Sequence, residues 1–139
     1  RYVQANNGTI NISGGSIILA AHAGSQSMGV VNAGFLNISG SAILDDAGHA
    51  SQALSTSATG GIDIASGWTG SWTYNGNDLA TWKAHFTSGD ITLGGVAIDG
   101  ATFDSNFSVT GNTLTAVPEP ASTAMLGLGS LALLLRRKK

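Results

Sequence analysis

Few residues in this 139-residue chain are of the types that bind metals or transfer protons. There is no cysteine, so thiolate metal sites, disulfides and a cysteine nucleophile are all excluded. The three histidines, His22, His49 and His85, are never three or four residues apart, the spacing that turns two imidazoles toward one metal on a helix. Asp45 and Asp46 are adjacent, but two carboxylates supply fewer oxygens than Ca²⁺ takes. The sequence therefore predicts no metal site and no cofactor.

Catalytic motifs are also missing from the sequence. It contains no G-x-S-x-G, no H-E-x-x-H and no phosphate-cradling Gly-Lys-Ser pattern. Residues 94–99, GGVAID, approach a calcium-binding nonapeptide, but Ala97 stands where that repeat has a glycine, and the pattern occurs once. We therefore expect a protein that is not an enzyme. A glycosidase with paired aspartates stays open as an alternative, although no spacing singles out a pair.

The charges are divided unevenly between the body and the tail of the chain. Residues 1–116 carry seven aspartates against Arg1 and Lys83, a formal charge of −5. Residues 117–139 carry four cations against Glu119, a formal charge of +3. A body with two widely separated cations cannot neutralise a row of phosphates, so nucleic acid is not an expected partner.

Aromatic side chains gather between residues 68 and 88. The stretch Trp72-Thr73-Tyr74, followed by Asn75-Gly76, predicts a strand that enters a tight turn. One interpretation of the cluster is a stacking platform for sugar rings, and the other is a cap that covers the open end of a stack of strands. The residues that would form the platform are Trp68, Trp72, Tyr74 and Trp82.

The elements that position these side chains belong to an internal repeat. Glycines open successive, equally spaced copies of it at residues 8, 34 and 60. Residues 8–33 share nine identities with residues 34–59. Each copy starts with an apolar-polar-apolar triplet, which sends two aliphatic side chains to one face of a strand and the polar one to the other. The triplets are Ile10-Asn11-Ile12, Leu36-Asn37-Ile38, Ile62-Asp63-Ile64 and, after a slightly longer interval, Ile91-Thr92-Leu93.

Strands of this kind, stacked about 4.8 Å apart, would form an aliphatic column inside and a polar ladder outside. We therefore predict an all-β protein, a right-handed parallel β-helix with about 26 residues per coil. A β-sandwich is the alternative, although it gives no reason for a register that recurs at this interval. The predicted organisation is a repeat region at 1–88, the C-terminal part of a longer rod, then a terminal β segment at 89–116 and a separate tail at 117–139.

The tail contains a glutamate between two prolines, then a run of uncharged, mainly apolar residues, and finally a cluster of basic residues. Residues 121–135 carry no charge and would extend about 22 Å as a helix, which predicts a short transmembrane helix. A basic cluster after that helix would stay on the cytoplasmic side and leave the body outside. The cluster consists of Arg136, Arg137, Lys138 and Lys139.

The residues Val117, Pro118, Glu119 and Pro120, with the apolar run and the basic end that follow, resemble the PEP-CTERM sorting signal of Gram-negative, exopolysaccharide-producing bacteria. The resemblance implies export, transient anchoring in the inner membrane through residues 121–135, and processing by an exosortase. The Pro-Glu-Pro residues would then be substrate positions. The resemblance further implies delivery to the cell surface or the extracellular matrix. The body is similar, more loosely, to autotransporter-like β-helical repeat passengers.

Together these patterns predict an exported surface or matrix protein with a structural or adhesive role, associated with exopolysaccharide, as in a biofilm. Two alternatives stay open. One is a β-helical polysaccharide-degrading enzyme, which would need a catalytic aspartate. The other is a plain tail-anchored envelope protein, which would keep its basic end at residues 136–139.

Overall fold

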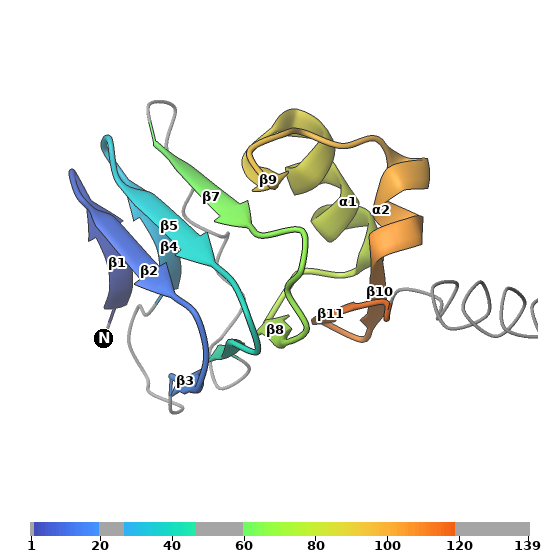
Figure 1. Ribbon diagram of the computed structural model, residues 1–139, viewed down its shortest axis with the longest axis horizontal. Helices are drawn as coiled ribbons and strands as arrows, with labels where there is room; N and C mark the ends of the chain where they lie inside the picture. Colours follow the sequence, from blue (N-terminus) through green and yellow to red (C-terminus); the bar gives the residue numbers. More distant parts are fainter. Residues whose placement is uncertain (1, 20–26, 47–59, 119–139) are drawn as a thin grey trace, which may run out of the picture.

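The computed structural model describes residues 2–19, 27–46 and 60–118, which form short strands and two helices (Figure 1). The strands belong to three sheets, and both helices follow the first eight strands. In chain order the elements are β1 (Tyr2–Asn6), β2 (Thr9–Ile12), β3 (Ser16–Ile18), β4 (Ser27–Val31), β5 (Phe35–Ile38), β6 (Ile43–Asp46), β7 (Gly61–Ile64), β8 (Ser71–Tyr74), α1 (Leu79–Ser88), β9 (Ile91–Leu93), α2 (Gly100–Asn106), β10 (Phe107–Thr110) and β11 (Thr113–Ala116).

Four parallel strands form a sheet in the order β2-β5-β7-β9. Ile10 aligns with Leu36 and Leu36 with Ile62, so each step along the sheet advances by one full copy of the repeat. Ile62 then aligns with Ile91, the slightly longer interval that the sequence shows. The predicted strand triplets and their register are therefore confirmed.

A five-stranded sheet has the order β10-β11-β8-β6-β3. Its strands β3, β6 and β8 are parallel, with Ile17 beside Leu44 and Leu44 beside Trp72. β11 pairs antiparallel with β8, and β10 pairs antiparallel with β11, so this sheet is mixed. A third sheet joins β1 and β4 in parallel.

The inward faces of the two larger sheets share one hydrophobic core. Strand alternation places Leu36, Ile38, Ile62 and Ile64 inside, and each of these side chains is at most 1% exposed. Burying an aliphatic side chain of this size contributes about 1.5–3 kcal/mol, so the aliphatic column is a large stabilising contribution to the stack.

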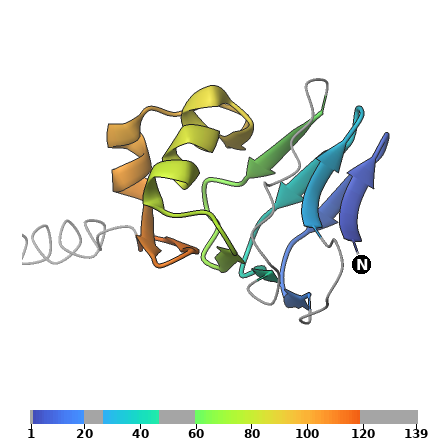
Figure 2. The ribbon, with the colours of Figure 1, turned by 180° about the vertical axis from the view of Figure 1, so that it is seen from behind.

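The helices α1 and α2 lie at the end of the stack where β9 is the last strand, as both views show (Figures 1 and 2). Each helix starts at an aspartate N-cap, whose side chain accepts a backbone N–H three residues later. Asp78 accepts from Thr81 at 2.8 Å, and Asp99 accepts from Thr102 at 2.7 Å. The aspartates thereby satisfy backbone donors that a helix cannot pair internally.

Aromatic rings hold the two helices against each other and against β10. The Phe86 ring of α1 lies 5.3 Å from the Phe103 ring of α2, and Phe103 lies 5.4 Å from Phe107. On the outside, Lys83 Nζ contacts Asp104 Oδ1 at 2.7 Å. The helices therefore close this end of the core with aromatic contacts and an exposed ion pair.

The fold class predicted for the body, a right-handed parallel β-helix, is wrong. The described strands form separate parallel and mixed sheets without a closed solenoid, because α1, α2 and the β10-β11 hairpin replace further coils. The sandwich alternative fails too, since strands from successive repeats pair in parallel. No helix among the described residues is long and apolar enough to cross a membrane. The predicted membrane segment, 121–135, lies outside those residues.

Candidate functional sites at the tail junction and on the polar sheet face

The body leads into the predicted sorting signal without a spacer. β11 ends at Ala116, and the N–H of Val117 donates a 2.8 Å hydrogen bond to the carbonyl of Asn106. Pro118, which is exposed, has no N–H with which to continue the pairing. The other residues predicted for processing and anchoring lie outside the described residues; they are Glu119, Pro120, the segment 121–135, and Arg136, Arg137, Lys138 and Lys139.

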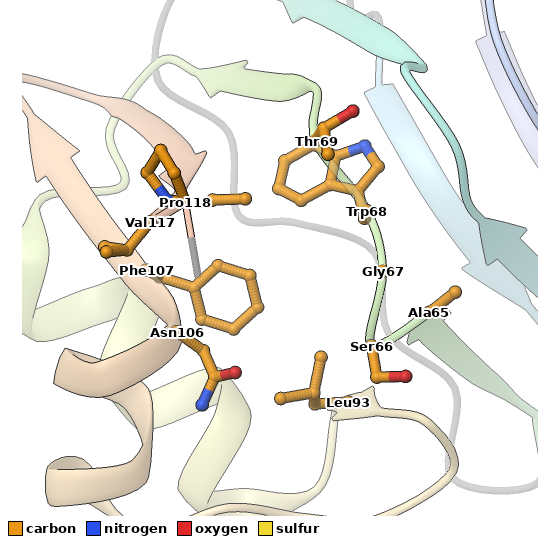
Figure 3. A pocket seen from close by; sticks show the side chains of 11 residues that line it. Ala65, Ser66, Gly67, Trp68, Thr69, Leu93, Asn106, Phe107, Val117 and Pro118 are labelled. Atoms are coloured by element: carbon orange, nitrogen blue, oxygen red, sulfur yellow. The ribbon is translucent and has the colours of Figure 1, made fainter. Parts of the chain in front are cut away.

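A pocket of about 460 Å³ lies at this junction (Figure 3). The loop after β7, including Trp68, forms one side, while Phe107 and Val117 stand opposite and Leu93 lies between them. Pro118 also lines the pocket. None of the described residues that line it carries a charge. The pocket is therefore an uncharged, mainly apolar site whose wall includes the start of the predicted signal.

Hydrogen bonds inside the core fix the orientation of two indoles. Trp68 Nε1 donates to the carbonyl of Ala42 at 3.0 Å, and Trp82 Nε1 donates to the carbonyl of Asn112 at 3.3 Å. Because the polar atom of Trp68 is bonded within the core, the small part of this side chain that reaches the pocket wall is apolar.

All four aromatic residues of the predicted sugar platform are buried. Trp72 and Trp82 are 0% exposed, Tyr74 is 2% exposed and Trp68 is 3% exposed. The rings of Trp72 and Trp82 pack edge to face with their centroids 5.3 Å apart. A stacked sugar needs an exposed ring face, which none of these residues presents in the folded body. The four rings instead belong to the hydrophobic core.

The outer face of the four-stranded sheet carries a row of polar side chains, one from each strand, which we call the polar ladder. Asn37 Nδ2 donates to Asn11 Oδ1 at 2.8 Å. Thr92 Oγ1 and the N–H of Gly95 both donate to Asp63 Oδ1 at 2.7 Å. The ladder comprises Asn11, Asn37, Asp63 and Thr92, in register across the sheet.

Phe35 stands on the same outer face, two residues before Asn37, and is 47% exposed. Its neighbours in register are Thr9, which is exposed, and Gly61, which has open space where a side chain would be. An exposed ring beside amides and a carboxylate can contact both the C–H face and the hydroxyl groups of a sugar. The sequence analysis missed Phe35 because it lies outside the aromatic cluster, although its alternation with Leu36 already placed it on the polar face.

Asp45 and Asp46 do not form a joint cation site, because neighbouring residues of strand β6 point to opposite faces. Asp46 is 1% exposed and lies in register with Tyr74. Burial, and in second place the charge of Asp46, raises the pKa of Tyr74 to about 12. This tyrosine therefore stays neutral at physiological pH and is a poor proton acceptor.

Of the three histidines, His85 lies in the described part of the chain, and it is beside one carboxylate. His85 Nδ1 lies 3.2 Å from Asp90 Oδ2 at the end of α1. Within the described residues, no group of three or more His, Asp or Glu side chains converges on a common point. His22 and His49 lie outside those residues.

Comparison with known protein families matches residues 116–138 to the PEP-CTERM protein-sorting motif. The resemblance inferred from the tail is thereby confirmed, and the match begins at the last residue of β11, beside the pocket. Such a motif implies processing by an exosortase and sorting to the cell surface. No curated protein and no solved structure matches the chain.

Proposed function

We propose that this chain, which carries a PEP-CTERM protein-sorting motif at residues 116–138, is a non-enzymatic protein of the cell surface or extracellular matrix that binds uncharged exopolysaccharide. One observation carries the proposal for the body. The exposed ring of Phe35 stands beside the polar ladder on the outer face of the β2-β5-β7-β9 sheet. The role of the body in the matrix would be structural or adhesive.

The tail determines where the protein is delivered. In this proposal the apolar segment 121–135 holds the exported precursor at the membrane transiently. The exosortase then acts at Pro118, Glu119 and Pro120, which are positions in its substrate, while the basic residues 136–139 stay behind on the cytoplasmic side. The folded body is released from the membrane into the polysaccharide.

The chemistry of the outer face suits a polymer of hydroxyl groups. A side-chain amide has two N–H donors and an oxygen acceptor, so the single bond between Asn37 and Asn11 leaves capacity for bonds to sugar hydroxyls. Strands about 4.8 Å apart repeat such groups at a regular interval, and a polysaccharide that contacts several of them gains affinity from multivalency.

The charge of the body favours an uncharged polysaccharide over an acidic one. Residues 1–116 have a formal charge of −5, and the ladder itself contains the carboxylate of Asp63. A polyanion would be repelled by this charge, whereas a neutral glycan would lose little by approaching it. We therefore expect binding to neutral exopolysaccharide that depends weakly on salt concentration.

The test is to replace Phe35→Ala and to measure retention of the purified body by neutral exopolysaccharide in affinity gel electrophoresis. Loss of an exposed stacking ring should weaken binding by about five- to tenfold, equivalent to roughly 1 kcal/mol. Leu79→Ala is the matched control, because Leu79 is similarly exposed, at 46%, but lies on α1. Equal retention of the Phe35→Ala variant and the wild type would contradict the proposal.

The non-enzymatic part of the proposal needs its own measurement. The body should leave the chain length of the polysaccharide unchanged after prolonged incubation, as measured by size-exclusion chromatography. Depolymerisation that disappears when a single aspartate is replaced would show that the protein is an enzyme.

A further inference from the structure

We infer that the pocket at the tail junction is a docking site for the sorting enzyme, which inserts an apolar side chain there while it holds the Pro-Glu-Pro residues. The inference rests on the sorting step of the proposed function. It adds to that step a second contact, made by the folded body and not by the tail.

The first argument is the length of the connection. The hydrogen bond from Val117 to the carbonyl of Asn106 holds residue 117 on the body. Two further residues extend the chain by at most ~7 Å, so Glu119 cannot be farther than that from Val117. An enzyme that encloses the Pro-Glu-Pro residues must therefore also touch the surface around Val117.

The second argument is that the pocket is continuous with the motif. Val117 and Pro118 lie within the matched sorting motif and also line the pocket. When the enzyme binds Val117 and Pro118, its surface lies next to the pocket. An enzyme that encloses these two residues would therefore also cover the pocket.

The third argument is the chemistry of the lining. Leu93 is partly exposed, only the edges of the buried Trp68 and Phe107 rings reach the pocket, and the described lining has no charged side chain. A charged group would lose its hydration there without gaining a partner, whereas an apolar side chain would gain from leaving water. The structure therefore favours an apolar occupant, and the volume of about 460 Å³ has room for a large side chain.

One glycine allows the pocket to be filled without strain. Gly67 lines the pocket, has open space where a Cβ would stand and has no positive φ angle. The substitution Gly67→Leu should therefore occupy the pocket and leave the body folded. Gly100→Leu is the matched control, because Gly100 also has open space and no positive φ, but is not a lining residue.

The experiment follows processing of the full precursor in cells that contain the exosortase, with the fraction of shortened product measured by intact mass over time. Gly67→Leu should slow processing about fivefold or more, as expected for loss of an interface anchor. Gly100→Leu should be processed like the wild type. Thermal melting of the purified variants verifies that both bodies are folded.

A spacer variant separates docking from simple crowding. Inserting Gly-Gly-Ser between Val117 and Pro118 moves the motif away from the pocket, and docking predicts slower processing. If the body only obstructs the enzyme, the spacer would speed processing and Gly67→Leu would have no effect, which would overturn the inference while leaving the sorting role intact. Failure of the wild-type precursor to be processed at all would instead overturn the sorting role, and the inference with it.

Discussion

A Cβ atom on Gly60 would overlap the backbone carbonyl of Gly34, the glycine that opens the preceding copy of the repeat. The same carbonyl accepts a 3.0 Å hydrogen bond from the N–H of Gly61. Gly34 in turn has the carbonyl of Ala5 where its own Cβ would stand. Gly34 and Gly60, which open the second and third copies of the repeat, therefore permit the close approach of neighbouring backbones.

Replacing Gly60→Ala should lower the free energy of unfolding by roughly 3 kcal/mol, because backbone atoms of two strands must move apart. Gly61→Ala is the matched control, since its Cβ would enter open space, and a side chain at a strand position reduces the entropy lost on folding. Denaturant unfolding of both variants measures the difference. Equal stabilities would show that the close contact is relieved without cost.

Replacing Trp72→Ala should destabilise the body by about 3–5 kcal/mol, because the indole is fully buried and its loss leaves a large cavity. Phe35→Ala should change stability far less, since that ring is 47% exposed. Calorimetric melting of the two variants distinguishes a core residue from a surface one. A Trp72→Ala variant that melts like the wild type yet loses sugar binding would restore the platform interpretation.

Acid should weaken the N-cap of α1 in a defined pH range. Hydrogen bonds from the backbone and hydroxyl of Thr81 lower the pKa of Asp78 below its ordinary value of 3.8. The unfolded chain therefore takes up this proton first, so the stabilisation is present above pH 3.8 and is lost as the pH falls through the lower folded-state pKa.

The variant Asp78→Asn keeps a side-chain oxygen at the N-cap but cannot titrate. Its melting temperature should fall less than that of the wild type when the pH is lowered from about 5 to about 2. Identical pH profiles would mean that the charge of Asp78 does not contribute to the cap.

The repeat register was predictable because it depends on local alternation and on identical residues that stack, such as Asn11 and Asn37. The strand ending at Tyr74 was predictable for a similar reason, since Asn75-Gly76 marks a turn. These features arise within a few residues of each other or within one repeat. They do not depend on how distant segments pack.

The helix α1 was missed although the sequence contains its signals. Asp78 is an N-cap residue, Trp82 and Phe86 are four apart on one face, and Gly89 ends the helix with φ of 84°. The predicted repeat region, residues 1–88, covered the whole of this helix. Closure of a β-helix was therefore expected where the chain instead places two helices over the last strand.

The candidate sites differ in the same way: contiguous residues of a site could be predicted from the sequence, and residues that packing brings together could not. The motif residues Val117 and Pro118 could be identified from the sequence because they are contiguous with the rest of the signal. The pocket beside these two residues forms only when the sheets pack and bring together Trp68, Leu93 and Phe107. No local sequence pattern therefore predicts it.

The hydrogen bond from Val117 to Asn106 extends the β10-β11 hairpin by one residue and fixes the start of the tail to the folded body. β11 also pairs with β8, and β8 with β6, so the strand that carries the tail is joined to the strands of the repeat. In an unfolded body the same signal would be attached to a flexible chain. An enzyme that docks on the body beside the motif, as inferred above, would therefore process a folded precursor faster than an unfolded one.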